Sequence, residues 1–415
     1  MRQTEKGTDM KKILLVINTM GQGGAEVSLL ALMKELPKLT DCRIDLYVML
    51  GQGELIDSIP PHVNLLNRKM DPTDVLSSAG RRRLYLHTSA KLLSRCAGLR
   101  NLPYMVKNYR AMRRSGNVIA KNLLWKAVSD GTAPPKEKYD LAIAYIEGAS
   151  TYYTAEKVDA DVKAAFVHTD YRKAGYTRQL DQGCYDRFGA IYCVSQEVRD
   201  TFLSEYPELR ERTHVFRNII DPGGIIEKSR AGAGFDDGFD GIRIVSLGRL
   251  IKLKAFDTAI EAAKLLTERG HRIRWYVFGE GEERVRLENE IKRQGLENVF
   301  FLCGTVRNPF PYMRQAQIFV QCSKYEGQSV AVREAKVLGM PVVLSLSNGN
   351  RDQITDGVDG IFVGTDALSV ADGIERLIVD PGLRKQLGEA AARSNQEHND
   401  ALQLLQLIEN RGGTK

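Results

Sequence analysis

Short apolar runs alternate with longer amphipathic segments along most of the chain. The first run, residues 11–18, is bounded by charged residues and glycine, which is typical of a parallel strand buried on both faces. A glycine turn and a helical pattern over 25–36 follow, and the alternation then repeats, which predicts successive βαβ units. The strands predicted in this first series are 11–18, 43–50, 63–66, 139–145, 163–168 and 190–194.

A second series of the same kind follows the Gly- and Asp-rich stretch 221–240, which we predict to be a linker because it is poor in apolar residues. The fold class is therefore α/β, with two doubly wound Rossmann-like domains at 1–220 and 241–395 that face each other across a ligand-binding cleft. Residues 396–415 are predicted to form a terminal helix that can pack back on the first domain. The second series comprises strands at 243–247, 273–278, 299–302, 318–321, 341–344 and 360–363, and helices at 255–269, 282–294, 307–315, 328–339, 366–378 and 381–395.

The net charge of +7 is concentrated in one segment. Twelve Lys and Arg residues and no acidic residue lie between Asp74 and Asp130, and the other 47 basic and 52 acidic residues leave the rest of the chain at −5. Over 80–128 these cations alternate with leucine and aromatic residues in a helical pattern. Such a segment suits an anionic membrane surface, a core-facing helix pair with a solvated basic face, or nucleic acid. We favour the anionic membrane surface and expect no nucleic acid partner.

Composition points to the cytoplasm. No segment approaches the ~20 apolar residues that span a bilayer, and the polar amino terminus, residues 1–10, predicts a short tail rather than a signal peptide. The six cysteines form no CxxC pair and lie among apolar neighbours, which favours reduced core residues. We expect a cytoplasmic protein, with peripheral attachment to the inner face of the plasma membrane as an option.

The most informative stretch for chemistry is 317–343. Glu326 follows an apolar strand, a helix is expected to begin near Ser329, and Glu334 lies about one turn into that helix. Free amides at the helix start favour an anion, and the two carboxylates can accept hydroxyl groups. By spacing alone, two surface glutamates are the simpler interpretation, one of them stabilising the helix start by ~0.3–1 kcal/mol.

Other predicted strand ends of the second series change that judgement. Gly248 and Arg249 follow the first strand, and Lys254 lies a few residues further on. An Arg fork and a Lys point charge together suit a diphosphate. A glycine turn follows the next strand, and the strand that ends near Val306 exposes backbone that can pair with a base edge. Taken singly, each feature also fits a solvated cation or an ordinary turn.

Together these segments resemble the retaining GT-B glycosyltransferases, specifically the family-4 group that includes bacterial mannosyl-, glucosyl- and galactosyltransferases of cell-surface glycan assembly. The resemblance covers nearly the whole chain and is strongest over 242–363 and 12–36. Glu326 and Glu334 match the E-x7-E motif of that family. Gly23-Gly24 matches the amino-terminal glycine loop of that family. Gly248-Arg249 and Lys254 match its diphosphate-binding Arg and Lys.

The resemblance implies a role for each matched residue. The implied catalytic residues are Glu326, Arg249, Lys254 and His168. The implied donor nucleotide-binding residues are Glu334, Gly248, Val306, Ser329, Val330 and Ala331. Gly23 and Gly24 would let the backbone approach donor and acceptor. Ala255 departs from the family pattern, which usually has glycine there, and His168 also fits a capping or core-edge histidine.

The implied activity is transfer of a sugar, with retention, from a nucleoside-diphosphate sugar to a hydroxyl of a glycan or polyprenyl-linked saccharide in surface polysaccharide biosynthesis. UDP-sugar is the favoured donor, and neither a metal nor a cofactor is expected because the nucleotide-sugar is a substrate. The first domain would bind the acceptor and the second the donor. The alternatives are another GT-B enzyme, such as a sugar-nucleotide epimerase or a phosphorylase, and a non-catalytic glycan-binding or regulatory homologue. A dinucleotide oxidoreductase fits less well because no full G-x-G-x-x-G follows the first strand.

Overall fold

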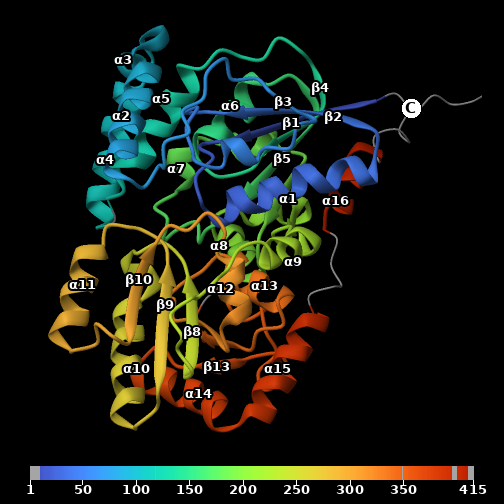
Figure 1. The fold of residues 1–415 in the computed structure, drawn as a ribbon. Coiled ribbons are helices and arrows are strands. Elements are labelled where there is room, and N and C mark those ends of the chain that lie inside the picture. Colours follow the sequence, from blue (N-terminus) through green and yellow to red (C-terminus); the bar gives the residue numbers. More distant parts are fainter. Residues whose placement is uncertain (1–9, 117, 348, 395–399, 410–415) are drawn as a thin grey trace, which may run out of the picture. The chain divides into compact units, whose positions relative to one another are not determined.

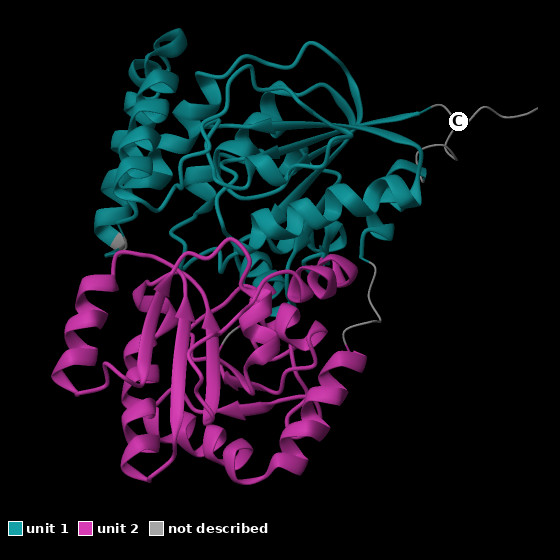
Figure 2. Ribbon diagram, viewed as in Figure 1, with its two compact units in different colours: residues 1–219, 399–415 teal, residues 220–398 magenta. Residues whose placement is uncertain are grey.

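The structure is a computed structural model that describes residues 10–116, 118–347, 349–394 and 400–409. The chain divides into two compact units (Figure 2). Unit 1 comprises 1–219 together with 399–415, and unit 2 comprises 220–398. The predicted amino-terminal tail lies almost entirely outside the described residues.

Unit 1 is built on a seven-stranded parallel sheet in the order β3-β2-β1-β4-β5-β6-β7. The strand order reverses between β1 and β4, which makes the sheet doubly wound and places ligands at the carboxyl ends of these central strands. The short last strand is the one that the sequence did not predict, because three residues with alternating burial give too weak a pattern. The strands are β1 (Lys11–Ile17), β2 (Cys42–Val48), β3 (Val63–Leu65), β4 (Tyr139–Ala144), β5 (Ala160–Val167), β6 (Ala190–Cys193) and β7 (Thr213–Val215).

Helices surround this sheet (Figure 1). The segment 80–128 is largely helical as predicted, and it forms most of α2 and α5 and all of α3 and α4. The helices of unit 1 are α1 (Gly24–Leu39), α2 (Ser78–Leu93), α3 (Ala97–Arg100), α4 (Leu102–Ser115), α5 (Trp125–Asp130), α6 (Ala149–Lys157), α7 (Arg178–Asp181), α8 (Gln196–Glu205) and α16 (Leu402–Glu409). Short 3-10 helices are η1 (Ile56–Ser58), η2 (Ser94–Cys96), η3 (Ala120–Leu124), η4 (Cys184–Arg187) and η5 (Pro207–Arg212).

The described part of the carboxy-terminal segment packs on the first sheet. Ala401 and Leu404 are fully buried in the same apolar cluster as β1 residues such as Ile13. The Gln403 side-chain amide donates to the Val215 carbonyl at 3.1 Å, and the backbone carbonyl of Gln403 accepts from the Tyr192 hydroxyl. The flanks of the predicted terminal helix, 395–399 and 410–415, lie outside the described residues.

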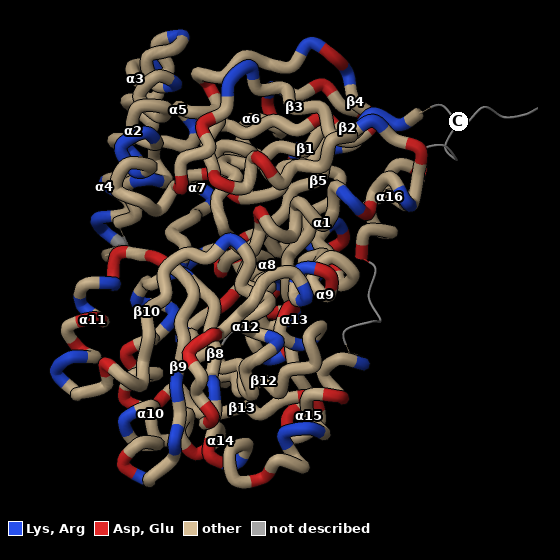
Figure 3. The backbone as a smooth tube through the Cα atoms, in the orientation of Figure 1, with Lys and Arg blue, Asp and Glu red and all other residues tan. Residues whose placement is uncertain are grey.

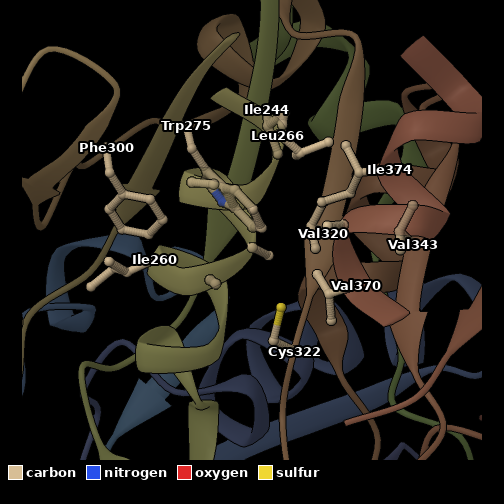
Figure 4. Close-up of a cluster of buried hydrophobic side chains, with 14 of the residues drawn as sticks. Ile244, Ile260, Leu266, Trp275, Phe300, Val320, Cys322, Val343, Val370 and Ile374 are labelled. Atoms are coloured by element: carbon tan, nitrogen blue, oxygen red, sulfur yellow. The ribbon is translucent and has the colours of Figure 1, made fainter. Parts of the chain in front are cut away.

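Unit 2 contains a six-stranded parallel sheet in the order β10-β9-β8-β11-β12-β13, with the switch point between β8 and β11. Trp275 and Val320 lie in its buried core (Figure 4). The indole N–H of Trp275 donates to Ser246 Oγ at 2.9 Å, and that hydroxyl donates to the Val320 carbonyl at 2.6 Å, so one buried chain of hydrogen bonds crosses three strands. The strands are β8 (Ile242–Leu247), β9 (Ile273–Phe278), β10 (Phe300–Gly304), β11 (Ile318–Gln321), β12 (Val342–Ser345) and β13 (Ile361–Val363).

The helices of unit 2 follow the predicted positions, with one exception. Residues 221–240 are not a simple linker, because they contain helix α9, which packs against α12 and α13. Asp221 caps α9 by accepting from the Gly224 amide, and Pro222 occupies its first turn. The helices are α9 (Pro222–Arg230), η6 (Lys252–Lys254), α10 (Phe256–Glu268), α11 (Arg284–Arg293), α12 (Phe310–Gln315), α13 (Val330–Val337), α14 (Ala367–Val379) and α15 (Pro381–Ser394).

The cysteines differ in part from the expectation of core residues. Cys184, Cys193 and Cys322 are buried, but Cys96 and Cys303 are exposed and Cys42 is half-buried. All six are free thiols. Apolar neighbours in the sequence are a poor guide to burial at element ends, where both exposed cysteines lie.

Candidate active site

The predicted donor residues of unit 2 gather at one edge of its sheet. Gly248 and Arg249 follow β8, whereas Glu326 follows β11, and these two strands flank the switch point. Because all strands are parallel, their carboxyl ends share this edge. The fold therefore places residues that lie more than seventy positions apart in the sequence next to each other.

Two glycines let the loops at this edge approach closely. A Cβ atom on Gly279 would lie 2.0 Å from the carbonyl oxygen of Gly248, and one on Gly248 would lie 3.2 Å from Cε of Lys254. The Leu250 amide also donates to the Glu280 carbonyl at 2.9 Å. Gly248 thus gives the Lys254 side chain the space that it occupies.

Lys254 and Glu326, predicted to have separate roles, contact each other directly. Lys254 Nζ lies 2.5 Å from Glu326 Oε1, and the two side chains are only 17% and 12% exposed. The same oxygen accepts from Gln321 Nε2 at 2.7 Å and from Ser323 Oγ at 2.5 Å. Three donors therefore hold one carboxylate oxygen of Glu326.

Residues that the sequence analysis missed support this carboxylate. Gln321 and Ser323 are buried at the end of β11, and Ser323 is fixed further by its carbonyl, which accepts from Ser345 Oγ at 2.6 Å. Gly349 has a positive φ of +83°, and a Cβ atom there would lie 1.7 Å from the Glu326 carbonyl oxygen. The signal that could have found the first two is the pair of polar residues that ends an otherwise apolar strand.

Arg249 has a different environment from Lys254. Its side chain is exposed and forms no ion pair within the described part of the chain. The loop then turns through η6 into Ala255, which has a φ of +50° and stands at the start of α10. The left-handed conformation that a glycine would favour is therefore kept with an alanine in its place.

Helix α13 begins where the sequence predicts. Ser329 is its N-cap residue, and Val330 and Ala331 are its first two residues. The Ser329 hydroxyl makes no capping hydrogen bond, and the amides of a first helical turn have no partner within the helix. These amides can therefore bind an anion next to Glu326.

Glu334 is a buried carboxylate. It is 8% exposed, and among the described residues no hydrogen bond or ion pair reaches its side chain. Burial raises its pKa to about 7, with a smaller opposing effect from the charge of Lys228 on α9. A buried carboxylate without donors is costly, so this group is suited to accept hydroxyl groups from a ligand.

Val306 lies in the loop between β10 and α12. Its side chain is half-buried against the apolar cluster that includes Phe278 and Phe310. The side chain therefore packs inward, and only the backbone of Val306 is available for the predicted contact with a base.

In unit 1, Gly23 and Gly24 form the start of α1. Gly23 is the N-cap residue, and a Cβ atom there would lie 2.3 Å from Oε2 of Glu26. The preceding Gln22 amide donates to Glu54 Oε1 at 2.7 Å. The loop is thus held with its backbone close to neighbouring side chains, as expected for a glycine loop.

His168 follows β5 and is a buried, neutral imidazole. Its ring lies against Tyr145 and Phe166, and burial lowers its pKa to about 4. Its Nε2 is buried and has no hydrogen-bond partner among the described residues. Because such a low pKa makes a weak base, the environment favours hydrogen bonding to a hydroxyl over proton transfer.

Glu147 is a further residue that the sequence analysis missed. Its Oε1 accepts from the amides of His168 and Thr169 at 2.8 and 2.9 Å and from the Thr169 hydroxyl. Its carbonyl accepts from Asn18 Nδ2 at 2.8 Å, and burial raises the pKa of its carboxyl. Glu147 therefore ties together the ends of β1, β4 and β5; an acidic residue two positions after the predicted strand 139–145 was the available signal.

Comparison with known proteins shows which family the second unit is similar to. Residues 236–394 match the family model described as glycosyl transferases group 1. An alpha-D-kanosaminyltransferase of Streptomyces kanamyceticus is 33% identical over 152 residues, 36% of this chain and 39% of that protein. The lipopolysaccharide core biosynthesis glycosyltransferase LpsE of Rhizobium meliloti is 28% identical over 181 residues, 43% of this chain and 52% of that protein. The matched part thus spans about half or less of these relatives.

Solved structures match over nearly the whole chain. HepE of Anabaena, in complex with UDP-glucose, is 16% identical with a TM-score of 0.65 and covers 98% of this chain and 100% of its own. Sucrose-phosphate synthase of Thermosynechococcus elongatus is 15% identical, with the same TM-score and coverage. The chain therefore has the GT-B fold, as predicted, and residues 236–394 of its second unit are similar to the glycosyl transferases group 1 family.

Proposed function

We propose that this protein is a retaining glycosyltransferase that moves a sugar from a nucleoside-diphosphate sugar to a hydroxyl of a glycan or lipid-linked acceptor in surface polysaccharide biosynthesis, with a UDP-sugar as the favoured donor. The family match over 236–394 supports the reaction class. HepE, which shares the fold, was solved with UDP and with UDP-glucose, and this favours UDP among the bases.

The observation that carries the proposal is the contact between Lys254 and Glu326 beside Arg249. The difficult step is departure of the diphosphate, and fixed cations at that position stabilise its growing charge. A diphosphate bound by Arg249 would compete with Glu326 for the Lys254 ammonium. That exchange would free an oxygen of Glu326 to accept hydroxyls of the donor sugar.

The nucleotide half of the donor has its own set of groups. Amides at the start of α13 complement a phosphate, and Glu334 can accept both ribose hydroxyls. We propose that Glu326 accepts hydrogen bonds from the donor sugar and does not attack it, and that the leaving phosphate takes the acceptor proton on the same face of the sugar. In unit 1, His168 would accept a hydrogen bond from a sugar hydroxyl through Nε2.

The decisive test is a donor screen with purified protein. Calorimetry with UDP, GDP, ADP and NAD should show a clear preference for one nucleoside diphosphate and no binding of NAD. Hydrolysis of the matching nucleotide-sugars should then identify the sugar. Binding of NAD alone, or of none of the four, would contradict the proposal. Conversion of the free donor into its epimer without any acceptor would instead indicate an epimerase.

The proposal includes a peripheral place at an anionic membrane, on the inner face of the plasma membrane. Figure 3 shows Lys and Arg positions along α2 and α4. Among the described helices, none is long and apolar enough to cross a membrane. Sedimentation with anionic and with neutral vesicles, at low and at high salt, tests this part. Binding to anionic vesicles that weakens with salt is expected, and absence of binding at low salt would contradict it.

A further inference from the structure

Helix α4 packs Tyr104, Met105 and Met112 inward, but it also buries a polar residue and exposes apolar ones. Asn108 is 2% exposed, whereas Leu102, Val106 and Tyr109 are 52%, 40% and 42% exposed. A surface helix of a soluble protein usually has the reverse arrangement. The outward face of α4 is therefore suited to contact the apolar part of a ligand.

Polar anchors explain how α4 stays in place despite this arrangement. The Tyr104 hydroxyl donates to the Leu180 carbonyl at 2.8 Å, and Asn101 Nδ2 donates to Asp130 at 2.8 Å. Met112 packs into the buried cluster beneath the helix. Since these contacts hold the inner face, the exposed apolar residues are not needed to attach the helix to unit 1.

The cations on the outer face of α4 have no acidic partner among the described residues. This holds for Lys107, Arg110 and Arg114, whereas other cations of the same basic segment are paired. Arg83 pairs with Asp71, and Lys126 pairs with Asp130 and Glu156. The α4 cations are thus available to an external anion.

A hollow of about 560 Å³ runs along α4 and is bounded on one side by Gln179. Leu102, Pro103 and Val106 give it apolar lining near the start of the helix, and its cations follow from Lys107 onward. At 1.5 Å per residue, the ends of the lining are roughly 18 Å apart. The lining residues used here are Leu102, Pro103, Val106, Lys107, Arg110 and Arg114.

Helix capping alone does not account for these charges. Cations in a last turn stabilise a helix through its dipole, which explains Arg114. Lys107 and Arg110 lie before that turn, and the apolar lining next to them has no role in capping. A ligand with an anionic end and an apolar end matches both halves of the hollow.

We propose that this hollow binds the phosphate of a single anionic lipid, with Lys107, Arg110 and Arg114 around the phosphate and with Leu102 and Val106 against the start of the acyl or prenyl chain. The proposal rests on the membrane part of the proposed function. It goes further, because it assigns a discrete lipid-binding site, whereas the proposed function includes only a general attraction of the basic segment to an anionic membrane. Single-stranded nucleic acid fits less well, since Leu102 and Val106 offer no flat ring on which a base can stack.

The test compares two triple variants that remove equal charge from the basic segment. Lys107→Ser/Arg110→Ser/Arg114→Ser alters the hollow, and Arg81→Ser/Arg82→Ser/Arg100→Ser alters exposed cations outside it. Sedimentation uses phosphatidylcholine vesicles with and without phosphatidic acid. We expect the hollow variant to lose roughly a hundredfold in affinity for phosphatidic acid vesicles and the control to lose much less.

Several outcomes would overturn the site. Equal losses of vesicle affinity in the two variants would indicate a diffuse basic surface without a discrete site. Unchanged affinity in both would show that the basic segment does not bind the membrane. Full competition by inorganic phosphate would indicate a site for free phosphate rather than lipid. Tighter binding of an RNA oligonucleotide than of phosphatidic acid vesicles, lost in the hollow variant, would indicate nucleic acid.

Two further measurements separate this proposal from the catalytic one. UDP binding should be the same in both triple variants as in the unaltered protein, which also shows that unit 2 is folded. Leu102→Ser/Val106→Ser should weaken vesicle binding while leaving its salt dependence unchanged, because it removes apolar contact and no charge. If the donor screen fails but these results hold, only the glycosyltransferase proposal is lost.

Discussion

Lys254 of unit 2 and the α4 cations of unit 1 have opposite environments. At the donor edge of unit 2, Lys254 is half-buried and already bound to Glu326, whereas the α4 cations of unit 1 are exposed and have no acidic partner among the described residues. An anion at the donor edge must displace a carboxylate, which demands a well-placed, multiply charged ligand. An anion at α4 displaces no carboxylate. That surface is therefore suited to bind anions of different kinds with little selectivity among them.

Solvent screening sharpens this difference. Exposed charges at α4 interact with an anion through water, and salt at 0.1 M largely screens such interactions beyond about 10 Å. The pair at the donor edge is shielded from water, so its exchange with a diphosphate depends less on salt. Vesicle binding and donor binding should therefore respond very differently to the same change in ionic strength.

The largest expected effect is on turnover at the donor edge. Arg249→Ala and Lys254→Ala should each lower kcat by about 10²–10³-fold, because in the proposed function each removes a cation that stabilises the leaving diphosphate. Lys252→Ala is the matched control, since this exposed lysine lies two positions before Lys254 in the same 3-10 helix. Steady-state kinetics with the identified donor provides the measurement. Near-normal turnover in both variants would refute the assigned roles.

A smaller effect is expected from the residues that position Glu326. Gln321→Leu and Ser323→Ala each remove one hydrogen bond to a charged oxygen, and we expect a loss of about tenfold in kcat/KM for the nucleotide-sugar. Affinity for UDP itself should stay unchanged, because neither residue contacts the nucleotide in this scheme. An equal loss of UDP affinity would show that these residues only support the loop fold.

The fold was largely predictable from the sequence, whereas the contacts within the site were not. Apolar runs of four to eight residues identified every strand except β7. Helix α9 was predicted to be part of a linker because its glycines are typical of loops. Asp221 followed by Pro222 is a capping signal that indicated a helix start. A pattern of residue types reports local conformation, so it cannot reveal that Lys254 contacts Glu326 across 72 positions.

The pKa of Glu334 predicts a pH dependence of donor binding. In the proposed function ribose hydroxyls donate to the ionised carboxylate, so affinity should rise with pH up to about 7 and level off above it. Below that value the loss approaches tenfold per pH unit. Calorimetry with UDP-glucose is suitable because both phosphates are esterified and stay ionised. Glu334→Gln should bind more weakly with no pH dependence, and a sloping profile in that variant would assign the titration to another group.

The same raised pKa has a consequence for stability with the opposite sign. The folded protein holds the Glu334 proton to higher pH than the unfolded chain does, so this group lowers the free energy of unfolding as pH rises from about 4.5 to about 7. Glu334→Gln should therefore gain stability relative to the unaltered protein above pH 7. Denaturant titrations at several pH values measure this, and an unchanged difference across pH would contradict the raised pKa.

The smallest expected effect concerns Ala255, where the chain departs from the glycine typical of the family it resembles. Its φ of +50° costs an alanine roughly 1 kcal/mol, and Ala255→Gly removes that strain. The added freedom of glycine in the unfolded chain offsets about 0.4–1 kcal/mol of the gain, so the free energy of unfolding should change by less than about 1 kcal/mol. Turnover should stay normal, because the glycine can keep the conformation that presents Lys254. A large loss of turnover with unchanged stability would instead show that the methyl group of Ala255 restrains this loop in the arrangement that the donor requires.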